Sequence, residues 1–210
     1  MNSLMENPVK KSLTIIAEAL ERAISYEEYL ALVSELAQAN SNSGPEKTEA
    51  LANYTQLNDR RMKRWNKTLK VSDEARALAE ALNRKVTWLV LTESWCGDAS
   101  PSLPVMNKLA QLNQRLDLKI VLRDENPELM DLFLTKGARS IPKLIALDSS
   151  TLQVLGEWGP RSTVPTKMVL DHKAEHGKLT AEFKQDLQVW YNKDKGQDII
   201  NDLMTLLALK

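Results

Sequence analysis

A single cysteine, Cys96, lies where a predicted strand gives way to a predicted helix. The preceding run, residues 86–91, is apolar and rich in β-forming residues, and apolar residues recur at helical spacing over 103–112. A thiol in the first turn of a helix faces free backbone N–H groups and the positive end of the helix dipole, which favour the nucleophilic thiolate. We therefore predict a reactive cysteine, although most lone cysteines are buried and behave as small hydrophobic residues.

The chemistry open to Cys96 is limited because the chain has no second cysteine. Thiol–disulfide exchange at a single cysteine leaves a mixed disulfide that only an external thiol can release. The expected partner is glutathione, another low-molecular-weight thiol, or a thiol or disulfide of a protein. Oxidation of Cys96 to a sulfenic acid is the other route.

Asp98 lies two residues after Cys96, in the first turn of the predicted helix. The helix dipole stabilises a carboxylate at this position, and its negative charge opposes formation of a thiolate nearby. Asp98 is predicted either to accept a proton or bind a cationic group, or merely to cap the helix. Together with Cys96 it forms the candidate catalytic pair.

The turn around the cysteine resembles the active site of thioredoxins. Trp95-Cys96-Gly97 is similar to the beginning of their active-site motif, with Ala99 standing where thioredoxins carry a second cysteine. Pro104 falls where that family has a proline that kinks the active-site helix. This resemblance implies that the helix after Cys96 carries the site.

Two later motifs extend the resemblance. Ile141-Pro142 looks like the Ile-Pro element of thioredoxins, which implies a cis peptide bond whose backbone groups lie opposite the sulfur. In Trp158-Gly159 the glycine falls where a thioredoxin glycine lines the groove beside the cysteine. The motifs span about residues 84–170 in the family's order and near its spacing, and they imply a thioredoxin fold.

A helix before this region takes part in a closer resemblance. Tyr54, Leu57, Asn58 and Arg61, together with the Trp-Cys-Gly-Asp-Ala turn, are similar to a bacterial thioredoxin-like family with a single cysteine in its motif. This similarity implies that the helix reaches over the groove and contributes Arg61 to it.

The resemblance implies an α/β fold with a central mixed sheet in the order βαβ-α-ββα and helical extensions at both termini. We expect an N-terminal helical extension over 1–83, a thioredoxin-like core over 84–176, and C-terminal helices over 177–210 that pack on the core. Strands are expected at 86–92, 118–124, 142–147 and 152–157, and core helices at 97–113, 127–136 and 163–176.

Local signals mark several helix ends outside and inside the core. Ser25 and Glu28 have the spacing of a capping box, and Ser72 precedes an alanine-rich helical stretch. Gly177 is predicted to end the last core helix, because glycine adopts the left-handed conformation found after many helices.

Three arginines flank the predicted site. Arg123 ends a predicted strand, Arg139 precedes the Ile-Pro element, and Arg161 follows Trp-Gly-Pro. Guanidinium groups hold carboxylates well, so these side chains are candidates for binding a carboxylate of a substrate such as glutathione, although surface ion pairs are the commoner role. The predicted substrate groove consists of Trp95, Gly97, Ile141, Pro142, Trp158, Gly159, Arg61, Arg123, Arg139 and Arg161.

Composition excludes several other functions. The 28 basic and 28 acidic residues balance, so we expect no nucleic-acid partner and no membrane association. The basic run at 60–70 is spread over several faces of a helix and is interpreted as a solvated face. His172 and His176 lack further ligands, so no metal or other cofactor is expected. A single cysteine and the lack of a signal-peptide pattern near the N-terminus indicate a cytoplasmic protein.

The sequence thus favours monothiol thiol–disulfide exchange, with Cys96 as the nucleophile and an external thiol as the resolving group. If the protein is an enzyme, it is a monothiol oxidoreductase. The alternative is a redox-silent binding or adaptor module that keeps the groove of the fold without catalysis, which Ala99 favours. A peroxide sensor that works through the sulfenate of Cys96 is a third hypothesis.

Overall fold

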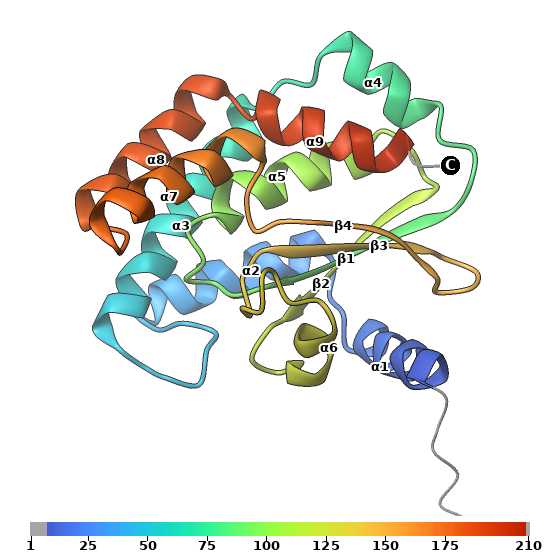
Figure 1. The fold of residues 1–210 in the computed structure, drawn as a ribbon, viewed down its shortest axis with the longest axis horizontal. Coiled ribbons are helices and arrows are strands. Elements are labelled where there is room, and N and C mark those ends of the chain that lie inside the picture. The colour runs from blue at the N-terminus through green and yellow to red at the C-terminus, as the bar shows by residue number, and fades with distance from the viewer. Residues whose placement is uncertain (1–7, 209–210) are drawn as a thin grey trace, which may run out of the picture.

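The computed structural model describes residues 8–208, and a four-stranded mixed sheet forms its centre (Figure 1). The strand order is β2-β1-β3-β4, with β1 and β2 parallel and the other two pairs antiparallel. β1 is buried along its whole length, as expected for an apolar central strand covered on both faces. The strands are β1 (Val86–Thr92), β2 (Leu116–Leu122), β3 (Lys143–Asp148) and β4 (Val154–Trp158).

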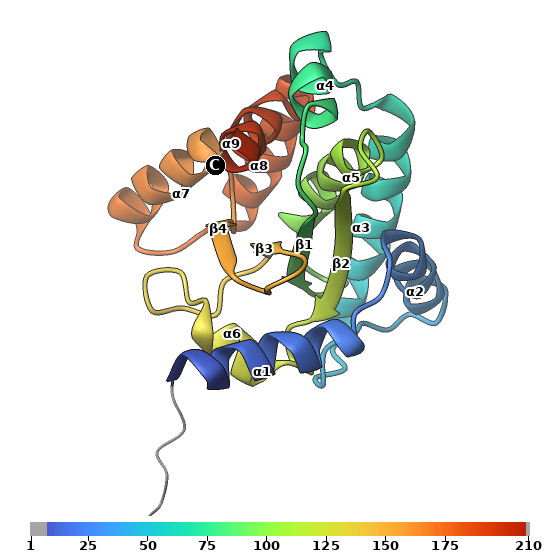
Figure 2. The same ribbon diagram turned by 90° about the vertical axis from the view of Figure 1, so that its right-hand side faces the viewer.

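Helices cover both faces of the sheet, which Figure 2 shows edge-on. α1 (Pro8–Glu21) and α6 (Pro127–Leu132) contact each other on one face. On the other face lie α5 (Ala99–Ala110), which follows the cysteine turn, and α9 (Gln197–Ala208), which contacts both α5 and β4. This arrangement is the α/β architecture that the sequence predicts.

The N-terminal helices belong to the same hydrophobic core as the sheet. α2 (Tyr26–Gln38) packs on α3 (Glu49–Thr68), and α3 packs on α5. Tyr29 and Trp65, from α2 and α3, are buried in one cluster with the strands. α4 (Asp73–Glu80) packs on α9, so residues from both extensions cover the core.

The C-terminal helices complete the side of the molecule near the cysteine. α7 (Thr163–His176) contacts α8 (Ala181–Asp194) and α9, and in Figure 1 α7 and α8 lie above α3. Leu187 and Tyr191 of α8 and Ile199 and Leu203 of α9 are buried. None of the helices in the described part of the chain is long and apolar enough to cross a membrane.

The predicted helix signals are confirmed. Ser25 and Glu28 form a reciprocal capping box, and the Ser72 hydroxyl accepts a hydrogen bond from the N–H of Ala75. Gly177 ends α7 with φ of 72°, in the left-handed region that favours glycine.

Several predicted boundaries need correction. β2 begins two residues before the predicted strand, at Leu116. α5 begins at Ala99 rather than at residue 97, because residues 93–98 form the turn that holds the cysteine. α6 ends at Leu132, four residues early, because Thr135 and Ala138 close a small antiparallel bridge around Gly137, whose φ is positive.

Candidate functional site

Cys96 lies in the turn between β1 and α5 and is almost completely buried, with 6% of its surface exposed. Its Sγ donates a hydrogen bond of 3.3 Å to the carbonyl oxygen of Ile141. The peptide bond between Ile141 and Pro142 is cis, as the resemblance to thioredoxins implies. The cysteine and the Ile-Pro element therefore face each other.

The expectation that the helix start activates this thiol is wrong. Burial, and secondly the negative charge of Asp98, raise the pKa of Cys96 to about 12. The backbone N–H groups of Ala99 and Asp98 and the guanidinium of Arg161 lower this pKa, but by less. At neutral pH Cys96 is therefore a protonated thiol, although groups that stabilise a thiolate surround it.

Asp98 is a buried carboxylate held by side chains from two other elements. It forms an ion pair with Arg161, with 2.6 Å between Oδ2 and Nη2, and it accepts a hydrogen bond of 3.3 Å from the hydroxyl of Tyr191. Burial raises the pKa of Asp98, whereas Arg161 opposes this rise. Asp98 occupies the N-cap position of α5, but its side chain makes no capping hydrogen bond there, so its carboxylate does not cap the helix as one predicted role required.

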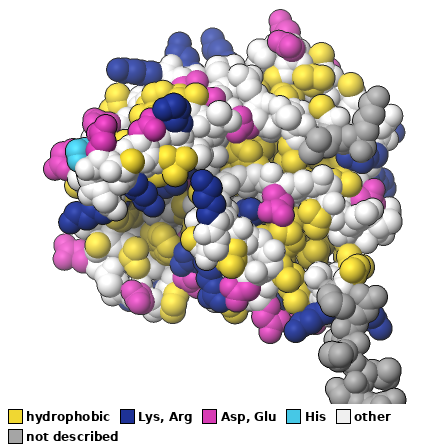
Figure 3. Space-filling view, viewed as in Figure 1, with side chains coloured by type: hydrophobic (Ala, Val, Ile, Leu, Met, Phe, Trp, Pro, Cys, Tyr) yellow, Lys and Arg dark blue, Asp and Glu magenta, His cyan; other side chains and the backbone are white. Residues whose placement is uncertain are grey.

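A groove of about 660 Å³ opens at this turn between α3 and α8. Figure 3 shows a recess with apolar side chains and with Lys and Arg side chains at its rim, below α7 and α8. Tyr54 and Arg61 line the groove, so the helix that carries them does reach over the site as the resemblance implies. Its apolar lining includes Leu51, Leu57, Ile141, Leu179 and Leu187.

One wall of the groove is formed by α8, and none of its residues was predicted to lie there. Lys184, Leu187 and Gln188 line the groove, and Gln188 Nε2 donates a hydrogen bond of 3.2 Å to the carbonyl of Gly97. The sequence predicted only that C-terminal helices over 177–210 pack on the core, without placing any of them beside the cysteine. The contacts join segments more than 90 residues apart, and no local pattern reports such a pairing.

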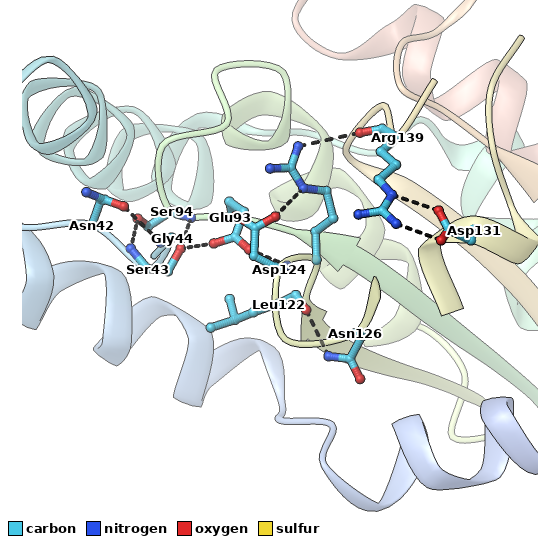
Figure 4. Close-up of polar contacts among 11 residues, drawn as sticks. Asn42, Ser43, Gly44, Glu93, Ser94, Leu122, Asp124, Asn126, Asp131 and Arg139 are labelled. Atoms are coloured by element: carbon cyan, nitrogen blue, oxygen red, sulfur yellow. Dashed lines mark hydrogen bonds and ion pairs between the residues drawn. The ribbon is translucent and has the colours of Figure 1, made fainter. Parts of the chain in front are cut away.

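A second polar cluster, shown in Figure 4, holds the residues before the cysteine. The carboxylate of Glu93 accepts hydrogen bonds from the hydroxyl of Ser43 and, at 2.9 Å, from the N–H of Asp124. Glu93 is completely buried, and burial raises its pKa. These contacts fix the end of β1 and therefore the position at which the turn begins.

Ser94 is fixed in the same way by the N-terminal helices. Its hydroxyl lies 2.9 Å from that of Thr55, and its carbonyl accepts a hydrogen bond of 2.9 Å from Asn58 Nδ2. The hydroxyl of Tyr29 donates to the carbonyl of Glu93 at 3.1 Å. The polar residues of α3 at helical spacing were a usable signal for this role, because they lie on its buried face.

The groove gathers only part of the predicted set. Its lining includes Trp95, Cys96, Gly97, Asp98, Ile141, Arg61 and Arg161, and does not include Pro142, Trp158, Gly159, Arg123 and Arg139.

Two of the residues outside the groove support it. Gly159, with φ of 113°, packs so closely against Pro142 that a Cβ atom would lie 2.2 Å from the Pro142 carbonyl oxygen. Only glycine is compatible with this approach and this φ. Trp158 donates its indole N–H to Asp202 of α9 at 3.2 Å. Both residues therefore brace the cis-proline turn and the last strand.

The other two arginines have different partners. Arg123 lies over the ring of Trp95, 4.9 Å from its centroid, and pairs with Asp124 at 2.7 Å. Arg139 makes two hydrogen bonds to the carboxylate of Asp131 at the exposed surface (Figure 4). Arg139 thus forms a surface ion pair, which is the commoner role of exposed arginines.

The histidines give no support for a metal site. His172 stacks on Phe183, with 4.1 Å between ring centroids, and its ring also meets that of His176 at 4.3 Å. Within residues 8–208 no three side chains of the metal-binding types come together.

The mixed sheet, the cysteine at the start of α5 and the cis-proline turn opposite it define a thioredoxin fold. A comparison with protein families matches the thioredoxin family over residues 44–182, which is more than half of the chain. The chain therefore belongs to the thioredoxin family.

Two solved structures resemble most of the chain. One is the 1.5 Å crystal structure of PA1234, a protein of unknown function from Pseudomonas aeruginosa, with 17% identity and a TM-score of 0.56 over 88% of this chain and 97% of that chain. The other is an HIV epitope-scaffold, with 17% identity and a TM-score of 0.53 over 88% and 98%. At such identities the likeness shows the fold alone. No curated protein matches the chain.

Proposed function

We propose that this thioredoxin-like protein carries out monothiol thiol–disulfide exchange at Cys96 with a small disulfide that enters the groove between α3 and α8. The observation that carries the proposal is the position of the sulfur. Sγ lies at the groove, against the Ile141 carbonyl of the cis-proline turn, and the N–H groups of Asp98 and Ala99 stabilise its thiolate.

The proposed reaction has two balanced steps. Cys96 gives its proton to the Asp98 carboxylate, and its sulfur attacks the disulfide RSSR, forming a Cys96–SR bond while the S–S bond of RSSR breaks. The leaving RS⁻ takes the proton from Asp98 and departs as RSH. An external thiol R′SH then attacks the bound sulfur of R, which yields RSSR′ and restores the Cys96 thiol.

Arg161 supports the transfer of charge in the first step. One negative charge is shared between Asp98 and the sulfur, and the guanidinium of Arg161 attracts it on either atom, because it lowers the pKa of both groups. Tyr191 and Gln188 keep the turn in place while the charge moves.

Mass spectrometry of the intact protein tests this proposal. After incubation with glutathione disulfide, we expect one glutathione on each chain, stable because Ala99 offers no resolving thiol, and its removal by added glutathione. Cys96→Ser is the control and should stay unmodified. If the native protein forms no adduct while the urea-unfolded chain does, the exchange proposal is wrong.

A binding module without redox chemistry is the second candidate, and one observation favours it. The thiol is buried and its pKa is raised, and both features disfavour the thiolate that reacts with disulfides. The failure of adduct formation described above would favour this reading, with the groove as the binding site.

A further inference from the structure

Two cations in the groove make no ion pair among the described residues. Arg161 is engaged by Asp98, whereas Arg61 and Lys184 have no carboxylate within ion-pair distance in this part of the chain. Nη1 of Arg61 donates to Asn58 Oδ1 at 3.1 Å, which is a neutral partner. The groove lining therefore has an excess of positive charge.

Arg61 is a half-buried cation that forms no direct ion pair among the described residues, although the charge of Asp98 acts on it from farther away. Burial lowers its pKa, and the neighbouring Arg64 lowers it further. A partly desolvated guanidinium without a direct carboxylate contact is well suited to form bidentate hydrogen bonds with an incoming carboxylate.

Lys184 supplies a second cationic point on the opposite wall. Its ammonium lies 5.9 Å from the centroid of the Tyr54 ring, on the α3 face that also carries Arg61. Tyr54 and Arg61 are seven residues apart, so their backbones lie about 10 Å apart along α3, and Lys184 lies beside the first of these two positions.

We propose that Arg61 and Lys184 bind the carboxylates of the substrate, and that the substrate is a small thiol or disulfide with two carboxylates separated by a short chain. The part of this inference that gives the ligand a thiol or disulfide rests on the proposed function, whereas the carboxylate site does not depend on it. Arg61 lies on α3, inside the region that matches the thioredoxin family, and Lys184 lies on α8, just beyond that region. The two helices wall the groove, which favours a small disulfide over the disulfide of a folded protein.

S-Methylglutathione tests the carboxylate site without any redox step, because its sulfur cannot exchange. We expect titration calorimetry on the full chain to show binding that is at least about tenfold weaker for the dimethyl ester, in which both carboxylates are neutral. Arg61→Gln and Lys184→Gln should each weaken binding of S-methylglutathione about tenfold and leave binding of the ester unchanged.

Matched variants provide the controls. Arg60→Gln lies beside Arg61 on α3 and Lys193→Gln lies on α8, and both side chains are exposed and outside the groove. They should bind S-methylglutathione as the native protein does, and circular dichroism confirms that all four variants are folded.

The outcomes separate this inference from the proposed function. Binding of S-methylglutathione that depends on Arg61 and Lys184, without adduct formation by glutathione disulfide, supports the carboxylate site and contradicts exchange. Equal affinity for the acid and the ester, an absence of binding, or equal losses in the control variants overturns the carboxylate site. If the carboxylate site is overturned but glutathione disulfide still forms an adduct with Cys96, the proposal of thiol–disulfide exchange is retained.

Discussion

The negative charge of Asp98 lies close enough to the sulfur of Cys96 to oppose its ionisation. Burial is the larger cause of the raised pKa, and the carboxylate adds to it, while Arg161 and two backbone N–H groups act in the opposite direction. Groups that stabilise a thiolate thus surround Cys96, but burial and the charge of Asp98 outweigh them and favour the protonated thiol. Removing the charge of Asp98 would leave Arg161 and the two backbone N–H groups to stabilise the thiolate with less opposition.

Asp98→Asn should therefore lower the pKa of Cys96 below its native value of about 12, because it removes a nearby negative charge. The pH dependence of alkylation by iodoacetamide measures this, and the midpoint should move to lower pH. Asp186→Asn, an exposed residue on α8, should leave the midpoint unchanged. A midpoint that stays or rises in Asp98→Asn would mean that the charge of Asp98 does not act on the sulfur, or that Asp98 is protonated and donates a hydrogen bond to the thiolate.

Sequence alone could place the cysteine but not its environment. The strand before Cys96, its position at a helix start and the cis-proline partner follow from local patterns and the family resemblance. The wall that α8 forms at the groove beside Cys96 does not, because α8 follows the cysteine by some 90 residues and its pattern shows only that one face is apolar. The sequence therefore predicts an activated thiolate, whereas the burial seen in the structure raises the pKa of Cys96.

Several elements are held by polar groups that come from distant helices. α7 begins after Ser162, whose side chain makes no capping hydrogen bond. Instead Asp202 of α9 accepts hydrogen bonds from the N–H and hydroxyl of Thr163, at 3.1 and 3.0 Å, and from the indole of Trp158. Asp198 accepts from the N–H of Val164 at 3.0 Å. α9 thus caps α7 and ties it to β4.

Asp202→Ala should destabilise the protein by about 2 kcal/mol, because it leaves the Trp158 indole and the first N–H of α7 without their acceptor. Urea unfolding measures the change in the free energy of unfolding. Asn201→Ala, an exposed neighbour on the same helix, is the control and should change this free energy by less than about 0.5 kcal/mol. Equal effects of the two variants would show that Asp202 does not act as the cap.

On the scale of the whole molecule, both helical extensions serve the site. α2 and α3 fix Glu93 and Ser94 by hydrogen bonds, and α8 fixes Gly97 and Asp98. The same helices wall the groove and share the core of the sheet. The sequence predicts that both extensions are helical and have apolar faces. That they enclose the cysteine together depends on tertiary packing between distant segments, which no local sequence pattern indicates.

If Cys96 is a functional nucleophile, it reacts with a disulfide that is first bound in the groove. A buried cysteine without this function would react only through random collisions. The most direct measurement is the rate of adduct formation at increasing concentrations of glutathione disulfide, followed by intact mass. We expect the rate to level off, because a site of limited capacity fills before the sulfur reacts. A rate that rises in proportion to concentration throughout, as it should for the urea-unfolded chain, would contradict the claim.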